Sequence, residues 1–420
     1  MMKKLKEFRQ NNGFTYSEMS KLTNTETDYA YKRLENGKVK PNQRQEKAIK
    51  KLFSFQKNLS FQLEVCFDWM SVRFKTTNTS DVILNVLKLP VDTFFEDDYA
   101  LYGYDSMRSW GNIHILSSTN QDLGTLIIMS GQGCRQYEEY LMEELKKEEW
   151  YDFFNRCFLY EEKWKIASDG KEIPRFLKFT RLDLALDEKY DKGFNYDLWT
   201  LLKKIHRGCV KTNKHEIRNV GTFLPRDNLS SGMSIYFGGK SANPLLRFYE
   251  KDYERASALG VSVEYVNKVL GFKNRYEIKI TDDLAMDFIK RYIKEYFDIG
   301  EEAVKFINGS VKVFEDPAHQ SLDTDWYSLV GATAKYKYSP PPKEKALAIN
   351  KKWTEDNVLP TIKFWAENDP KWYEEMMKHT APSKKLEKLK ALEQAKNETE
   401  RLFQNQTGER EIYQPLHPLP

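Results

Sequence analysis

Cysteine is scarce in this sequence, and its placement excludes the usual cysteine-based frameworks. The four cysteines (Cys66, Cys134, Cys157 and Cys209) show no CxxC spacing, which argues against a zinc site or a disulfide scaffold. Long apolar runs are also missing, since no segment approaches the roughly 18 apolar residues of a membrane span. The start MMKKLKEFRQNN lacks the apolar core of a signal peptide. We therefore expect a cytoplasmic protein without membrane insertion.

What the sequence does have is length and an uneven distribution of charge. Its 420 residues are too many for one ordinary domain, so two or three domains are expected. Residues 1–60 hold 14 lysines and arginines against 6 acidic residues, a net charge of +8, whereas the whole chain carries only +4. A basic front module before a near-neutral body favours binding to a polyanion such as nucleic acid.

The front module has the pattern of three short helices, at residues 2–11, 17–22 and 26–35, the last stopped by Asn36 and Gly37. The stretch YKRLENGKVKPNQRQEKAIKKLF resembles the helix-turn-helix family of phage repressors. That resemblance implies that four residues face DNA and that three lysines lie near phosphates: Thr25, Thr27, Asp28 and Tyr31, and Lys32, Lys38 and Lys40. The alternative is a basic helical bundle that only solubilises the terminus.

The body of the chain mixes strands and helices without a regular βαβ period. Apolar or alternating runs such as 61–74, 124–129, 176–187 and 274–281 predict strands. We expect an α+β fold: an all-α helix-turn-helix domain at 1–58, a largely antiparallel-sheet catalytic domain at 59–300 and a C-terminal helical region at 301–420. In that last region, residues 384–402 read as a charged helix after a Ser383 cap.

Two predicted strands carry acidic residues in alternation. TRLDLALD places three leucines on one face and Arg181, Asp183 and Asp187 on the other. The two aspartates lie about 13 Å apart along a strand, so only one of them is expected to bind a metal directly. If RYEIKIT is the neighbouring strand, Asp183 and Glu277 can face one another at a separation suited to a hard divalent cation. The alternative is that these carboxylates form surface ion pairs with Arg181 and Arg275.

Three motifs together resemble a known family. FTRLDLALD, YFGGKSANPLLRFYEK and RYEIKI occur in this order, and they are similar to the replication initiation factor family. That family includes the initiators of staphylococcal rolling-circle plasmids and the MOBT relaxases of conjugative elements. The similarity covers roughly residues 61–290, with weaker echoes in CFDWMSVRF, SGQGC and TIKFWAEN. The helix-turn-helix segment in front is closer to the relaxase branch.

The resemblance implies a nicking enzyme. It makes Tyr249 the nucleophile that forms a 5′-phosphotyrosyl link, with Arg247 and Lys251 beside it to favour the phenolate. It also implies a divalent metal, Mg²⁺ or Mn²⁺, at Asp183 and Glu277 with Asp187 farther away. Lys240 stands where many relatives have arginine, which keeps the charge for DNA but loses bidentate geometry.

The histidines and a glycine-containing turn are further candidates for parts of a metal site or a phosphate-binding site. None of the six histidines has the His-hydrophobic-His spacing of the more familiar rolling-circle nickases, and His215 is only a distant candidate as a third ligand. The SGQG turn could cradle a phosphate, but Gly131 and Gly133 more simply shape a strand-to-helix turn.

The function expected from these features is that of a relaxase at an origin of transfer. A rolling-circle replication initiator and a non-enzymatic helix-turn-helix regulator are the rivals. The implied partners are double- and single-stranded DNA, together with a host helicase and conjugative accessory or coupling proteins.

Overall fold

The computed structural model describes residues 2–11, 14–54, 63–167, 175–192, 195–224, 229–330 and 358–380, with residues 354 and 390. The chain divides into two compact units, 1–341 and 342–420. In the second, α15 (Leu359–Asn368) and α16 (Pro370–His379) form a helix pair in which Trp365 lies 5.3 Å from Trp372, between ring centroids. The helix expected at 384–402 lies outside the described residues, apart from residue 390. Among the described residues, no helix is both long and apolar enough to span a membrane.

The first unit begins with the expected helix-turn-helix domain. Its helices are α1 (Met2–Asn11), α2 (Tyr16–Leu22), α3 (Asp28–Glu35) and α4 (Gln43–Ser54). Thr15 and Glu18 form a reciprocal capping box at the start of α2, and the Thr27 hydroxyl caps α3. After α3 the chain turns at Gly37, whose φ of 70° suits glycine. Local signals therefore define both helices of the motif.

The helix-turn-helix domain packs against the rest of the first unit. Glu18 is bound by Lys211 at 2.6 Å and by Lys312 at 2.8 Å. Although burial raises the pKa of Glu18, the hydrogen bonds from these two lysines lower it to about 2. The ring of Phe14 lies 6.0 Å from that of Tyr327, between centroids. Both charged and aromatic contacts thus join the two parts.

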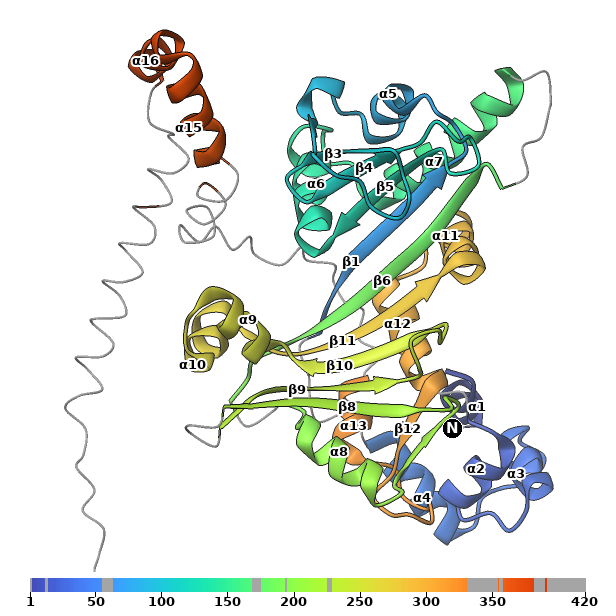
Figure 1. Cartoon of the computed structure of the whole chain (residues 1–420). Coiled ribbons are helices and arrows are strands. Elements are labelled where there is room, and N and C mark those ends of the chain that lie inside the picture. Colours follow the sequence, from blue (N-terminus) through green and yellow to red (C-terminus); the bar gives the residue numbers. More distant parts are fainter. Residues whose placement is uncertain are drawn as a thin grey trace, which may run out of the picture. The chain divides into compact units, whose positions relative to one another are not determined.

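The centre of the first unit is one ten-stranded sheet in which every neighbouring pair is antiparallel, as Figure 1 shows. The spatial order is β2 (Phe95–Glu96), β3 (Ser106–Trp110), β4 (Ile113–Ser117), β5 (Thr125–Ser130), β1 (Leu63–Phe74), β6 (Leu177–Lys189), β11 (Phe272–Thr281), β10 (Leu245–Glu250), β9 (Leu229–Phe237) and β8 (Ile217–Leu224). The α+β prediction with a largely antiparallel sheet is confirmed.

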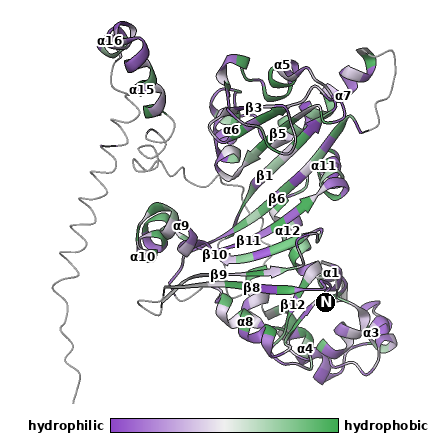
Figure 2. Ribbon diagram, in the orientation of Figure 1, coloured by the Kyte–Doolittle hydropathy of each residue, from purple (hydrophilic) through white to green (hydrophobic). Residues whose placement is uncertain are grey.

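The two faces of the sheet differ as the alternation predicts. Leu182, Leu184 and Leu186 are fully buried, in one core with residues of α7 (Trp150–Ala167), α11 (Asp282–Glu295) and α12 (Ile299–Ser310). Figure 2 shows hydrophobic and hydrophilic residues along the same long strands. Five charged residues of these strands, Arg181, Asp183, Asp187, Arg275 and Glu277, therefore gather on the opposite face, whereas Glu188 of β6 is buried on the core side and accepts a hydrogen bond from the Tyr276 hydroxyl.

Smaller elements complete the first unit. They are α5 (Thr79–Val82), η2 (Ile83–Leu87), η3 (Val91–Thr93), α6 (Gly131–Glu143), α8 (Leu198–His206), α9 (Lys251–Leu259), α10 (Val263–Tyr265), η4 (Val266–Leu270) and α13 (Thr324–Val330), with a two-stranded sheet of β7 (Val210–Thr212) and β12 (Val311–Val313). The predicted boundary after residue 300 falls inside α12, whose buried side chains belong to the main core. The fold of the central domain thus continues past that position.

The SGQG segment is a strand-to-helix turn. Strand β5 ends at Ser130 and α6 begins at Gly131. A Cβ on Gly133 would lie 2.1 Å from the carbonyl oxygen of Asn112, so only glycine fits there. The close approach of these two backbones accounts for Gly133 without a phosphate.

Candidate active site

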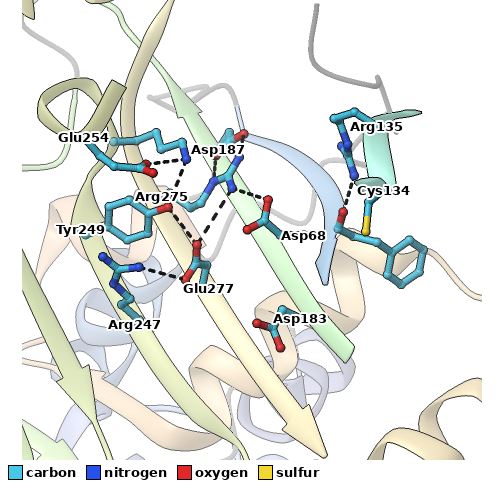
Figure 3. Close-up of polar contacts among 12 residues, drawn as sticks. Asp68, Cys134, Arg135, Asp183, Asp187, Arg247, Tyr249, Glu254, Arg275 and Glu277 are labelled. Carbon is cyan, nitrogen blue, oxygen red and sulfur yellow. Dashed lines mark hydrogen bonds and ion pairs between the residues drawn. The ribbon is translucent and has the colours of Figure 1, made fainter. Parts of the chain in front are cut away.

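Tyr249 lies near the end of β10, in the interior of the ten-stranded sheet. The register places it opposite Ser234 of β9 and Arg275 of β11. Arg247, two residues earlier, is opposite Glu277 and shares its face. These side chains converge on the face opposite the apolar core (Figure 3).

Three charged groups surround the Tyr249 side chain, which is only 3% exposed. Its hydroxyl donates a hydrogen bond to Glu277 Oε1 at 2.8 Å and accepts one from Lys251 Nζ at 3.2 Å. The Arg247 guanidinium carbon lies 4.0 Å from the ring centroid. Lys251 is the first residue of α9 rather than part of the strand, yet it still reaches the phenol. The predicted trio of Tyr249, Arg247 and Lys251 is therefore assembled in space.

The protonation of this tyrosine differs from the expectation. Burial raises the pKa of Tyr249 well above its ordinary value, and this outweighs the lowering by Arg275. Glu277 opposes ionisation as well, since a carboxylate next to the phenol disfavours a second negative charge. Burial thus outweighs the nearby cations, and they do not give this tyrosine a low pKa in this structure. The phenol is protonated at neutral pH and its proton points to Glu277.

Arg275 occupies the centre of a carboxylate cluster. Its guanidinium binds Asp187 with bonds of 2.5 and 2.7 Å and Asp68 with one of 2.6 Å, and it lies 4.0 Å from Glu277. Burial raises the pKa of Asp68, but Arg275 outweighs this and holds it below the usual range. Burial first, and the charge of Asp68 second, raise the pKa of Glu277 to about 7. Glu277 is therefore the least compensated carboxylate of the cluster.

Asp68 is a site residue that the sequence reasoning missed. It lies on β1, at the irregularity between Phe67 and Trp69 where the pairing with β6 shifts by one residue. The shift turns Asp68 toward Arg275, a residue 207 positions away in sequence. Its sequence signal was its position in CFDWMSVRF, a segment with a weaker echo of the family, in which the sequence reasoning gave Asp68 no role.

The predicted metal ligands are arranged differently from the expectation. Strands β6 and β11 are neighbours, as predicted, but Asp183 is opposite Lys279 while Glu277 is opposite Ala185. Asp183 is bound by the Arg181 guanidinium at 2.9 and 2.5 Å, and Asp187 is bound by Arg275. The alternative of arginine ion pairs is the one observed, although the pairs are buried rather than superficial. His215 is exposed, away from this cluster of buried side chains.

The described residues contain no group of three or more His, Cys, Asp or Glu side chains arranged to hold a metal. Two carboxylates of the cluster nevertheless provide part of the oxygen ligands that a hard divalent cation needs. Asp68 and Glu277 are carboxylates whose charges repel one another, and Mg²⁺ commonly binds one or two protein carboxylates together with waters and substrate phosphates. Asp183 and Asp187 have both carboxylate oxygens bound by an arginine, whereas only one oxygen of Asp68 is bound by Arg275, so the first two fit that role less well.

Most of the residues predicted to bind DNA are exposed. Thr27, Asp28, Lys32, Lys38 and Lys40 are exposed, and Lys240 is exposed in the turn between β9 and β10.

Two of the predicted DNA-facing positions are wrong. Tyr31 is 0% exposed and its hydroxyl donates to Glu35, while Thr25 is 8% exposed and hydrogen-bonds Thr23. Both belong to the packing between the helices rather than to its surface. The exposed aromatic residue of α3 is instead Tyr29, at 71%.

The antiparallel sheet thus places a tyrosine among carboxylates and basic groups, in a chain that begins with a helix-turn-helix domain. The chain belongs to the replication initiation factor family. The family model matches residues 177–380, and that of the rolling circle replication initiation protein N-terminal domain matches residues 64–156.

A relative and a solved structure agree with this membership. The putative DNA relaxase NicK of Bacillus subtilis (strain 168) is 31% identical over 309 residues, covering 72% of this chain and 80% of the relative. The structure of a rolling circle replication initiator protein from Geobacillus stearothermophilus superposes with a TM-score of 0.52 at 22% identity. That match covers 67% of this chain and 100% of the other, and at this identity it supports the fold.

Replacing Asp187 by alanine is expected to destabilise the protein by about 3 kcal/mol, because it leaves the buried Arg275 guanidinium without its bidentate partner. Asp183→Ala should cost less, since the Arg181 side chain is 36% exposed and can be solvated. Urea denaturation of the two variants beside the wild type measures the difference. Equal stability of Asp187→Ala and wild type would contradict the structural role of the Asp187 pair.

Proposed function

We propose that this protein nicks one strand of DNA at an origin of transfer, stays attached through Tyr249 and later rejoins the strand. The observation that carries the proposal is the Tyr249 hydroxyl held between Glu277 and Lys251 on an interior strand of the sheet. Membership in the replication initiation factor family and the similarity to a putative DNA relaxase support it.

The proposed reaction is a transesterification that needs no oxidant or external energy. The Tyr249 oxygen attacks a phosphodiester phosphorus, and the bond from phosphorus to the 3′ oxygen breaks. A 5′-phosphotyrosyl bond forms, and the leaving oxygen takes a proton to become a 3′-hydroxyl. Attack by that hydroxyl on the phosphotyrosine reverses the step and closes the strand.

The surrounding side chains have separate tasks in this scheme. Glu277 Oε1 accepts the hydrogen bond of the phenol and so holds the proton that must leave Tyr249. Arg247 and Lys251 lie next to the phenol, where they stabilise negative charge on the phenolate and on the attacked phosphate. Arg275 fixes the positions of Asp68 and Asp187 through its hydrogen bonds.

A divalent cation, Mg²⁺ or Mn²⁺, is expected in the reaction, and Glu277 and Asp68 are the side chains that would hold it. When bound, such an ion polarises the phosphate and offsets its developing charge. Two carboxylates provide only part of a coordination shell, so DNA phosphate oxygens and water are expected to complete it.

A rolling-circle replication initiator would use the same chemistry, and the Geobacillus stearothermophilus protein that shares the fold bears that description. The relaxase proposal is preferred because the Bacillus subtilis relative, matched over 80% of its length, is described as a relaxase.

Incubation of a supercoiled plasmid carrying the cognate origin with the protein and Mn²⁺ tests whether the protein is a nicking enzyme, as both a relaxase and a replication initiator would be. If the protein binds the plasmid but does not relax it, the nicking function is contradicted and the protein is a non-enzymatic DNA-binding regulator. A host helicase and conjugative coupling proteins are the partners we propose for later steps.

Deleting residues 1–58 is expected to weaken binding to the duplex origin, because exposed lysines such as Lys32 and Lys38 leave with the helix-turn-helix domain. The affinity should fall roughly tenfold or more at fixed salt. Cleavage of a single-stranded nick-site oligonucleotide should change little, since Tyr249 and its partners all lie outside the deleted segment. Electrophoretic mobility shift and oligonucleotide cleavage assays measure the two effects.

The deletion uncovers Phe14's partner Tyr327 and frees Lys211 and Lys312 from Glu18. A second variant, with Lys32, Lys38 and Lys40 changed to alanine in the full chain, therefore serves as the control that keeps this contact. Unchanged duplex affinity and salt dependence in that variant would remove the DNA-binding assignment.

A further inference from the structure

The face of the sheet that carries Tyr249 continues toward β1, where it presents a tryptophan and an arginine. Trp69 of β1 is opposite Asp183 of β6, so Trp69, Asp183 and Arg181 share this face. The Arg181 guanidinium carbon lies 4.1 Å from the centroid of the Trp69 ring. Both side chains are partly exposed. The helices of the core cover the opposite face, so this pair is open to a ligand.

A tyrosine stands next to this pair. Tyr102 lies in the segment between β2 and β3 and is 66% exposed. Neighbouring residues Ala100 and Tyr104 pack with Trp69 against a small apolar cluster. The segment is therefore held beside Trp69 and is not a free loop.

The backbone around Tyr102 holds its ring outward. Tyr102 and Gly103, with φ of 56° and 77°, form a tight turn closed by a 3.1 Å hydrogen bond from the Tyr104 amide to the Leu101 carbonyl, and this turn leaves the Tyr102 ring exposed to solvent. The buried Trp69 Nε1 has no hydrogen-bond partner among the described residues. A buried donor without an acceptor is unfavourable, and an acceptor supplied by a ligand would satisfy it.

The position of the group suits one class of ligand. From Tyr249 to Trp69 the path crosses three strand spacings and about four residues along a strand, roughly 20 Å in all. Lys279 and Arg181 lie along it, on β11 and β6. Aromatic rings for bases and cations for phosphates at this spacing are what non-specific single-strand binding sites use.

We infer that Trp69, Arg181 and Tyr102 form a binding site for single-stranded DNA, in which bases flanking the attacked phosphate stack on the two aromatic rings. The site deepens the proposed function, on which its link to the nicked strand rests, but binding itself needs no cleavage. Arg181 and Asp183 form an ion pair without net charge, so Asp183 does not repel the strand, and Lys279 is the uncompensated cation among the described residues of the path.

The test uses the full chain and a fluorescein-labelled oligothymidylate of about 20 nucleotides, long enough for one such site. Fluorescence anisotropy should show that Tyr102→Ala weakens binding about 5- to 100-fold, the range for loss of one stacked base. Tyr102→Phe should bind like wild type, because the ring and not the hydroxyl stacks. Ultraviolet crosslinking followed by peptide mapping should place thymine adducts on Trp69 or Tyr102.

Tyr296→Ala is the matched control. Tyr296 is 59% exposed and follows α11 on the core side of the sheet, so its loss should not change oligothymidylate affinity. Wild-type affinity of Tyr102→Ala, or adducts confined to the helix-turn-helix domain, would overturn the inference. If Tyr102→Ala weakens binding but no origin is ever nicked, the single-strand site stands and only the proposed function falls.

Discussion

Phenylalanine in place of Tyr249 is expected to eliminate the covalent protein–DNA adduct, with nicking reduced roughly a thousandfold or more, as for loss of a nucleophile. The substitution removes only the oxygen that would attack. The ring packs under Arg247 and remains in the variant, so the sheet should fold and bind DNA as before. Cleavage of a labelled nick-site oligonucleotide, followed by denaturing electrophoresis, measures the adduct directly.

Two neighbouring tyrosines provide controls for this experiment. Tyr236 lies opposite Arg247 on β9 and Tyr253 lies in α9, and the phenylalanine variant of each should keep the adduct. Arg247→Ala should slow adduct formation without eliminating it, because Arg247 would stabilise charge and form no bond. Protease digestion and mass spectrometry identify the modified peptide. A DNA-linked peptide that lacks Tyr249, or an adduct that persists in Tyr249→Phe, would contradict the assignment of Tyr249 as the nucleophile.

The second large effect is expected at Glu277. Glu277→Gln keeps the size of the side chain but removes its charge, and with it the acceptor for the Tyr249 proton and one side chain of the proposed cation site. Nicking of the origin plasmid should fall about 10²- to 10⁴-fold, the range for loss of a positioned acid–base group. Chelation by EDTA should stop wild-type nicking, and Mn²⁺ or Mg²⁺ should restore it.

The remaining carboxylates separate the roles at this site. Asp68→Asn should reduce nicking strongly and weaken Mn²⁺ binding measured by calorimetry in the presence of uncleaved DNA. Asp183→Asn should be milder, because Asp183 is already bound to Arg181 and lies opposite Lys279. The reverse order, with Asp183 indispensable and Asp68 dispensable, would restore Asp183 as the ligand and remove Asp68 from the site.

Much of the fold could be predicted because its signals are local. The alternation of Leu182, Leu184 and Leu186 predicted the buried face of β6. Capping residues and a stop signal marked the helices of the front domain. Each of these depends on residues within a few positions of one another, so a single sequence contains the information.

The parts that could not be predicted depend on long-range register. Asp68 reaches Arg275 because of a one-residue shift between β1 and β6, and a shift of that kind leaves no clear pattern in the sequence. The high pKa of Tyr249 comes from burial under neighbouring elements, whereas the sequence showed only two nearby cations. Tyr31 was misplaced because a short amphipathic helix does not reveal which of its faces meets the rest of the domain.

The contact between Glu18 and the two lysines of the small sheet has a consequence for geometry along DNA. Because Lys211 and Lys312 join the helix-turn-helix domain to the same compact unit that holds Tyr249, α3 and Tyr249 keep a set separation. Duplex DNA turns once in about 10 base pairs, so the proposed nick and the segment that α3 is proposed to bind are expected to lie at a fixed angular position around the duplex. The distance between binding sequence and nick in the origin would then be part of its specificity, in addition to the bases themselves.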